Sequence, residues 1–343
     1  MRLLVLIMLA GWLGSAFAAA APGDHEFSLT HDGLRRAYLV RVPPQASEGA
    51  ALPVVLNFHG GGGNARVHKW YTRMDETADR EGFIAVYPNG SGGIGERFLT
   101  WNAGNCCGVS AATGVDDVGF VLAVIEDLAT RATIDRARVY ATGLSNGSMM
   151  AYRLAAEAAD RIAAVGGVAG AMTLARFAPG RPVPVMHIHS VDDERALYDG
   201  GLGPAFPFTN TRVFHHSVKT MIEKWVEQNR CPARPAESVT VSGAAGSGDE
   251  QHTATRMAYR PCHDGSAVVL WKLAGPGHVW PGGQRDYLPL LLGTSSAVID
   301  ANRELWRFFR HYRRAHTAAS AARNYLGSVS ARLNGLCSAS SSM

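Results

Sequence analysis

Short apolar runs alternate with segments of helical periodicity along most of the chain. A continuous apolar run predicts a buried strand, whereas apolar residues that recur every three to four positions predict a helix with one buried face. The predicted strands lie at 53–58, 83–87, 138–142, 163–170, 183–189 and 268–273. The predicted helices lie at 67–81, 118–129, 148–154, 213–228 and 298–312. Because the two kinds of element alternate, the sequence predicts an α/β fold with a mostly parallel central sheet and helices on both faces.

Other stretches predict antiparallel strands. Residues 27–42 alternate between apolar and polar side chains, which is typical of a hairpin at the edge of a sheet. Residues 238–241 and 253–259 predict two more strands, and Cys231 and Cys262 stand on either side of them. A disulfide between these two cysteines would hold that excursion to the rest of the domain.

The two ends of the chain differ from its centre. Arg2, an apolar stretch at 3–13 and Ala16-Phe17-Ala18 form a signal-peptide pattern, assigned to residues 1–20, with Ala18-Ala19-Ala20 as a second candidate cleavage site. This pattern predicts a secreted or periplasmic protein. The apolar stretch is too short to span a bilayer comfortably, so no membrane anchor is expected. Residues 21–315 predict one catalytic domain, and the Ala, Ser and Arg of 316–343 predict a disordered tail.

The charge and the cysteines narrow the classes of function. The net charge is only +4, and a solvated helix face explains the late arginines, so nucleic-acid binding is not expected. Five cysteines in an exported protein predict disulfides, and no pair of ligands at the right spacing predicts a metal or other cofactor. Cys106 and Cys107 are neighbours, and a bond between neighbours is strained. One of them could pair with Cys337 instead, and the sequence leaves that pairing open.

Gly143-Leu144-Ser145-Asn146-Gly147 stands between a predicted strand and a predicted helix. This order is the nucleophile elbow of α/β-hydrolases, in which a tight turn exposes a serine hydroxyl above the sheet. Chance alone would produce roughly 0.3 copies of the five-residue pattern in so glycine-rich a chain, and the alternative is a surface turn. Whether Ser145 is a nucleophile therefore depends on whether the chain also supplies an acid and, after it, a histidine.

Candidate partners follow the later strands in that order. His278 lies in the loop 275–283, directly after the last strand, and predicts the catalytic base. Asp192, Asp193 and Glu194 follow the strand that ends at His189. A carboxylate there would accept the Nδ1 proton of the imidazole and fix its tautomer. The residues alone leave open which acid does so.

A glycine run after the first central strand predicts an oxyanion hole. The backbone N–H groups of Asn146, after the nucleophile, and of Gly61 would hold the developing negative charge. The stretch Gly60-x-Gly62-x-x-Ala65 also fits a dinucleotide-binding pattern. An exported protein has no ready nicotinamide pool, and a preceding His-Gly suits esterases better.

At these motifs the chain resembles the secreted esterases grouped with polyhydroxybutyrate depolymerases and bacterial feruloyl esterases. The resemblance covers roughly residues 30–312 and rests on unusual strings: His59-Gly60-Gly61-Gly62, Tyr87-Pro88-Asn89-Gly90, Trp101-Asn102 with Cys106-Cys107-Gly108, residues 115–120, the elbow, and Gly277-His278-Val279-Trp280-Pro281-Gly282. It implies an α/β-hydrolase fold and serine carboxylic ester hydrolysis. Its register places the acid on Asp193, although Ser190 and Glu194 depart from the family pattern and keep Asp192 open.

The resemblance also frames the substrate. It implies short-chain, feruloyl, acetyl or hydroxyalkanoate esters, free, oligomeric or linked to polysaccharide. Trp101 and Trp280 could stack on a substrate ring, although packing is the simpler role for a tryptophan. The alternatives are a depolymerase acting on solid polyhydroxybutyrate, a serine peptidase of the same fold, and a non-catalytic binding protein on a hydrolase scaffold.

Overall fold

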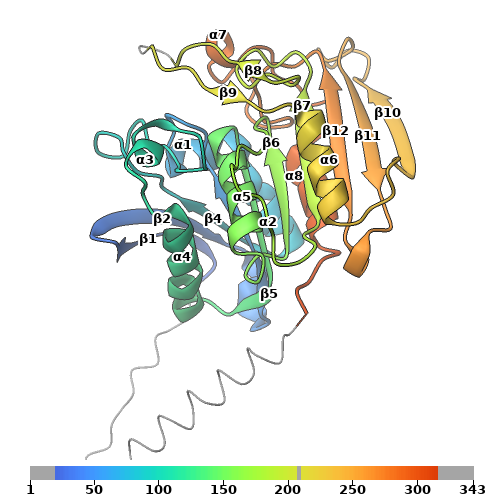
Figure 1. The fold of residues 1–343 in the computed structure, drawn as a ribbon. Helices are drawn as coiled ribbons and strands as arrows, with labels where there is room; N and C mark the ends of the chain where they lie inside the picture. Colours follow the sequence, from blue (N-terminus) through green and yellow to red (C-terminus); the bar gives the residue numbers. More distant parts are fainter. Residues whose placement is uncertain (1–19, 207–209, 316–343) are drawn as a thin grey trace, which may run out of the picture.

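A ten-stranded sheet runs through the part of the chain that the computed structural model describes, residues 20–206 and 210–315 (Figure 1). The strand order is β1-β2-β4-β3-β5-β6-β7-β12-β11-β10. Neighbours from β4 to β12 are parallel, and the pairs toward both edges are antiparallel. The α/β fold with a mostly parallel central sheet is therefore confirmed.

The strands are, in chain order, β1 Gly23–His31, β2 Leu34–Val42, β3 Leu52–Phe58, β4 Ile84–Pro88, β5 Ile134–Leu144, β6 Ala164–Val168, β7 Val185–Ser190, β8 Gly201–Leu202, β9 Phe214–His215, β10 Glu237–Ser242, β11 Thr253–Tyr259 and β12 Val268–Ala274. The helices are α1 Ala65–Thr72, α2 Met74–Glu81, α3 Gly108–Ala112, α4 Asp117–Arg131, α5 Asn146–Glu157, α6 Val218–Gln228, α7 Pro289–Leu292 and α8 Ala301–Phe309. Two 3-10 turns lie at Pro44–Glu48 and His263–Gly265, and β8 and β9 pair separately from the main sheet.

Helices cover both faces of the sheet. α4, α5 and α6 pack their apolar side chains on one face, and α1, α2 and α8 pack theirs on the other (Figure 1). Every residue of β3, β4, β6 and β7 is buried in consequence. This is why these strands read as continuous apolar runs rather than as alternating ones.

Several predicted helices have different bounds in the structure; the one predicted over 298–312, for example, is the shorter α8. The single helix predicted over 67–81 is two helices, because Arg73 has a left-handed backbone (φ 54°) that ends α1 and begins α2. Both helices bury residues against the same face, so the apolar pattern runs through the break. The helix predicted from residue 213 begins only at Val218, where the Ser217 hydroxyl accepts the N–H of Thr220 at 3.0 Å. A side-chain cap of this kind fixes a helix start that periodicity does not show.

The antiparallel excursion between α6 and β12 is closed by a disulfide. Cys231 lies just after α6 and Cys262 just after β11, and their sulfur atoms are bonded at 2.01 Å. β10 and β11 are the two strands predicted at 238–241 and 253–259, and they extend the sheet beyond β12.

Residues 1–19 and 316–343 lie outside the described residues, and with them the predicted signal peptide, the predicted tail and Cys337. Among the helices of the described residues, none is long and apolar enough to cross a membrane.

The carboxyl ends of the parallel strands meet at one edge of the sheet. β5, β6, β7 and β12 are consecutive neighbours there, so the loops that follow β5, β7 and β12 lie close together. The β8–β9 pair and α7 lie at this same end of the molecule (Figure 1). This is the edge at which open α/β sheets place their ligands.

Candidate active site

Ser145 occupies a strained turn between β5 and α5. Its backbone has φ 56° and ψ −120°, a combination that L-residues rarely adopt. A Cβ atom added to Gly143 or to Gly147 would lie 2.6 or 2.2 Å from the carbonyl oxygen of Phe58. Both glycines of the elbow are therefore required by the close approach of β3, and they let the turn hold Ser145 at the carboxyl end of β5.

Asp193 is the acid that contacts His278. Its Oδ2 atom accepts the Nδ1 proton of His278 at 2.7 Å, and its Oδ1 atom accepts the backbone N–H groups of Arg195 and Ala196, each at 2.8 Å. Asp192 is exposed and accepts instead from the backbone N–H of Gly275 at 2.6 Å. The choice that the sequence left open thus falls to Asp193 by geometry.

The buried Asp193 carboxylate remains ionised. Burial raises its pKa, but His278 and the hydrogen bonds from His189 and His278 lower it by more, so its pKa lies well below the ordinary 3.8. His189 reaches the same oxygen as His278, with Nε2 at 3.2 Å from Oδ2. The carboxylate can therefore orient the imidazole and stabilise a positive charge on it.

A line of buried polar side chains stands behind Asp193. The Tyr152 hydroxyl lies 2.9 Å from His187 Nδ1, and His187 Nε2 lies 3.0 Å from His189 Nδ1. His189 Nε2 donates to the carbonyl oxygen of Ala196 at 2.7 Å, because a carbonyl only accepts. Burial lowers the pKa of His187 well below its ordinary value, so this ring is neutral. Sequence reasoning missed His187 and Tyr152; two histidines in an otherwise apolar strand were the available signal.

His278 is held by the loop between β12 and α7. Its backbone N–H donates to the carbonyl oxygen of Leu292 at 2.6 Å, and Gly277 donates to Thr294 at 3.0 Å. A Cβ atom on Gly277 would lie 2.3 Å from the Leu292 oxygen, so only glycine fits beside the histidine. The loop thus fixes where the imidazole lies relative to Asp193.

Gly61 and Asn146 lie side by side, as an oxyanion hole requires. A Cβ atom added to Gly61 would lie 3.6 Å from the Cβ of Asn146. Neither backbone N–H donates a hydrogen bond to another described residue, and Asn146 begins α5, whose N-terminus favours negative charge. Both groups are therefore available to an oxyanion.

His59 holds the glycine run in place as a neutral ring. Its Nε2 accepts the N–H of Gly90 at 2.9 Å, and its Nδ1 donates to the carbonyl oxygen of Gly60 at 2.8 Å. Burial lowers the pKa of His59 to about 4. The glycines thus form a loop that lies against the end of β4 and the elbow.

The substrate-stacking role suggested for Trp101 and Trp280 is wrong, and both pack in the core, which was the simpler of the two roles. Trp101 is 0% and Trp280 2% exposed, so neither ring can face a cleft. Their indole N–H groups donate to His59 O and Asn302 Oδ1, each at 3.0 Å. An aromatic ring of the described residues that does lie beside the glycine run is that of Phe206, 3.5 Å from a Cβ position on Gly61. Nothing in the sequence around Phe206 pointed to this place.

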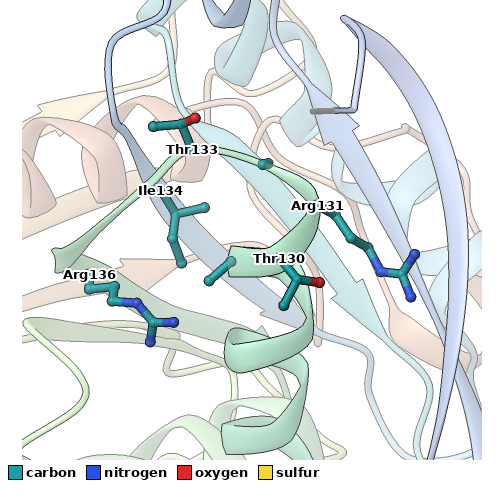
Figure 2. A pocket seen from close by; sticks show the side chains of 7 residues that line it. Thr130, Arg131, Thr133, Ile134 and Arg136 are labelled. Carbon is teal, nitrogen blue, oxygen red and sulfur yellow. The ribbon is translucent and has the colours of Figure 1, made fainter. Parts of the chain in front are cut away.

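Two other features lie away from these residues. A cavity lined by Thr130, Arg131, Thr133, Ile134 and Arg136 lies where α4 runs into β5, at the opposite end of β5 from Ser145 (Figure 2). Among the described residues, His31, Asp32 and Asp116 come close enough together to hold a metal ion. His31 Nε2 lies 2.9 Å from Asp116 Oδ2, and Asp116 caps α4, so a hydrogen bond at a helix start accounts for this group.

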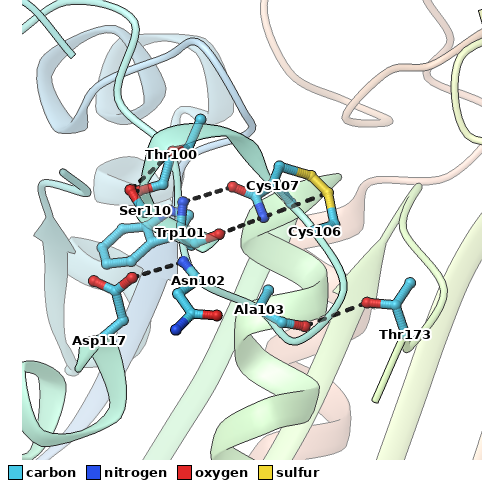
Figure 3. Close-up of a disulfide and its surroundings, with 10 residues drawn as sticks. Thr100, Trp101, Asn102, Ala103, Cys106, Cys107, Ser110, Asp117 and Thr173 are labelled. Carbon is cyan, nitrogen blue, oxygen red and sulfur yellow. Dashed lines mark hydrogen bonds between the residues drawn. A yellow bond between two sulfur atoms is a disulfide. The ribbon is translucent and has the colours of Figure 1, made fainter. Parts of the chain in front are cut away.

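Cys106 and Cys107 form a disulfide with each other (Figure 3). The sequence left open a pairing of one of them with Cys337, which lies outside the described residues. The pair is buried and lies beside the Trp101 backbone, whose carbonyl oxygen accepts the N–H of Cys107 at 3.0 Å.

Known proteins similar to this chain are esterases. The family model described as "Esterase PHB depolymerase" matches residues 36–223. The protein named "Putative esterase NocK" of Nocardia uniformis subsp. tsuyamanensis is 31% identical over 272 residues, which cover 77% of this chain and 76% of that one. Feruloyl esterase B of Piromyces equi is 26% identical over 71% of this chain, and the match spans 42% of that protein.

A solved structure shares the fold. The acetyl xylan esterase from Aspergillus awamori matches with a TM-score of 0.52 and 13% identity, over 83% of this chain and 98% of that one.

Proposed function

The chain belongs to the esterase PHB depolymerase family, and from this premise we propose that Ser145, His278 and Asp193 are the catalytic triad of this serine esterase. The family establishes carboxylic ester hydrolysis as the reaction. The observation that carries the assignment of residues is the 2.7 Å contact between Asp193 and His278, on loops that follow β7 and β12. The half-buried turn at Ser145 ends β5 at the same edge of the sheet.

In this mechanism Ser145 attacks the ester carbonyl while His278 removes its proton through Nε2. Asp193 holds the Nδ1 proton and stabilises the imidazolium that forms. The carbonyl oxygen becomes an oxyanion, which accepts the N–H groups of Gly61 and Asn146. His278 then protonates the departing alcohol, which leaves an acyl group on Ser145. A water molecule, deprotonated by His278, hydrolyses this acyl-enzyme and restores the serine.

The substrate class we propose is a soluble ester with a short-chain, acetyl, feruloyl or hydroxyalkanoate acyl group, either oligomeric or linked to polysaccharide. The names of two relatives support acetyl and feruloyl groups, since one is a bifunctional acetylxylan esterase/xylanase of Neocallimastix patriciarum and the other the feruloyl esterase of Piromyces equi. The place of action we propose is the periplasm or the medium. The signal-peptide pattern and the Cys231–Cys262 disulfide support it.

The test is a panel of substrates with Ser145→Ala as the comparison. Nitrophenyl esters of rising acyl length, methyl ferulate, acetylated xylan, polyhydroxybutyrate particles and a peptide anilide would be assayed with purified protein. Loss of the nucleophile should lower turnover by about 10⁴ to 10⁶. Ser238→Ala, which removes an exposed hydroxyl of β10, is the matched control and should behave as wild type.

Labelling by a fluorophosphonate provides a second readout, because it marks an activated serine without depending on the ester chosen. The wild-type protein and Ser238→Ala should be labelled, and Ser145→Ala should not. Wild-type esterase activity in Ser145→Ala would refute the assignment. Turnover confined to polyhydroxybutyrate particles or to the peptide would overturn the proposed substrate class.

A further inference from the structure

The two loops that carry the oxyanion donors are joined by one residue, Trp101, which bonds to one loop through its side chain and to the other through its backbone. It lies between β4 and α4 in sequence and is fully buried. Its indole Nε1–H donates to the carbonyl oxygen of His59 at 3.0 Å. His59 lies two residues before Gly61, so this bond fixes the loop that carries the first donor.

The backbone of Trp101 holds the other loop. Its N–H donates to Asn146 Oδ1 at 2.7 Å, and Asn146 Nδ2 donates back to its carbonyl oxygen at 3.1 Å. The amide of Asn146 is thus clamped by both polar groups of one residue. Since this same Asn146 supplies the second oxyanion N–H, the clamp acts on the first residue of α5.

Trp101 is itself held from behind. The N–H of Cys107 donates to its carbonyl oxygen at 3.0 Å, and the N–H of Asn102 donates to the buried Asp117 at 2.7 Å (Figure 3). Asp117 is paired with the buried Arg36 at 2.6 Å, and the Arg36 guanidinium lies 5.4 Å from the centre of the Trp101 ring. These contacts come from three different parts of the chain and leave the residue little freedom to move.

We propose that Trp101 is a positioning residue for the oxyanion hole, one that sets the spacing between the N–H groups of Gly61 and Asn146 by bonding to both loops. The proposal rests on the proposed function. Donors preorganised at the place where the oxyanion forms stabilise the transition state far more than the ground state. Loss of the brace should therefore lower kcat and leave KM almost unchanged.

Trp101→Phe tests this, because it keeps an aromatic ring and removes only the indole part that reaches His59. We expect kcat for 4-nitrophenyl acetate to fall about tenfold, the effect of one lost buried hydrogen bond, with KM within about twofold of wild type. Affinity for an alkylboronic acid, whose tetrahedral adduct places an oxygen in the hole, should fall by a similar factor.

Trp225→Phe is the matched control. Trp225 of α6 is also 0% exposed, but its indole nitrogen has no hydrogen-bond partner among the described residues. It should lose apolar packing as Trp101→Phe does while keeping wild-type kcat and boronate affinity. Thermal unfolding of both variants then separates a loss of stability from a loss of positioning.

Asn146→Ala supplies a second route, since it keeps the backbone N–H and removes both contacts to Trp101. Its kcat should fall as well, and the double variant should lose less than the product of the two single losses, because either change breaks the same brace. Wild-type kcat in a folded Trp101→Phe, or an equal loss in Trp225→Phe, would overturn the proposal. Activity retained in Ser145→Ala would instead overturn the proposed function, so the two failures can be told apart.

Discussion

Asp192 and Asp193 are neighbours in the chain, yet their carboxylates serve different partners. Asp193 is buried and bonds to His278, whereas Asp192 is exposed and caps the N–H of Gly275. The chain turns after β7, so consecutive side chains there point in different directions. Sequence order predicted that an acid follows β7, but which acid turns inward depends on this local backbone.

The two aspartates form a matched pair for mutation. Asp193→Asn should lower kcat by about 10⁴, because an amide cannot hold the Nδ1 proton of His278 in the required tautomer. Asp192→Asn keeps an oxygen that can accept from Gly275 and should change kcat by less than about threefold. Steady-state kinetics on one nitrophenyl ester would measure both values of kcat. A larger loss in Asp192→Asn than in Asp193→Asn would show that Asp192, not Asp193, is the catalytic acid.

Chain order and burial decide which single residues the sequence can point to. Ser145 and His278 stand in short glycine-rich strings whose order along the chain is set by chemistry, so the sequence alone is sufficient to propose them. Trp101 and Trp280 stand in equally unusual strings, but the sequence does not say which side of the backbone faces the core. Phe206 comes to Gly61 from a distant loop, and only the folded chain brings the two together.

Among the elements, the buried strands were the easiest to predict and the helix ends the hardest. β3, β4 and β7 are covered on both faces, so their apolar runs were unambiguous. The break at Arg73 depends on one left-handed residue, which any periodic pattern passes over. The β10–β11 excursion differs from the buried strands, because β10 is largely exposed and the Cys231–Cys262 disulfide ties the two ends of the excursion together.

Removal of that bond should weaken the fold and leave the chemistry intact. Cys231 and Cys262 are 31 residues apart, so Cys231→Ser with Cys262→Ser should lower the free energy of unfolding by about 3 to 4 kcal/mol, chiefly by freeing the unfolded chain. Urea unfolding would measure this loss. The value of kcat should stay at the wild-type level, because neither cysteine contacts Ser145, Asp193 or His278; a loss of kcat below the unfolding transition would contradict this.

On the scale of the whole molecule, four histidines of the described part of the chain, His215 of β9 among them, are buried and have a lowered pKa. His59 holds the glycine run, His68 bonds to Asn57 at 2.8 Å, and His187 lies in β7. Burial lowers the pKa of each one, in the case of His59 from 6.5 to about 4. Between about pH 6.5 and 4 these histidines are therefore protonated in the unfolded chain but neutral in the folded protein.

The fold should consequently lose stability as the pH falls from about 6.5 toward 4. In this window the unfolded state binds more protons than the native state, so the free energy of unfolding decreases with decreasing pH, and His59 alone accounts for about 3 kcal/mol by the bottom of the window. Asp193 has the opposite kind of shift, and its contribution is lost only below about pH 4. Urea unfolding at several pH values would check this; a flat profile between pH 6.5 and 4.5 would contradict it.

The Cys106–Cys107 disulfide should affect how fast each folded molecule turns over substrate, and not only how much folded protein is obtained. The pair lies against Trp101 and, with Cys106 Sγ 3.9 Å from Asn146 Nδ2, against the clamp on the oxyanion loop. Reduced material from a cytoplasmic expression host should therefore contain folded molecules that react slowly. Active-site titration would count its serines, and turnover per titrated serine should rise when the same chain is routed through an oxidising compartment.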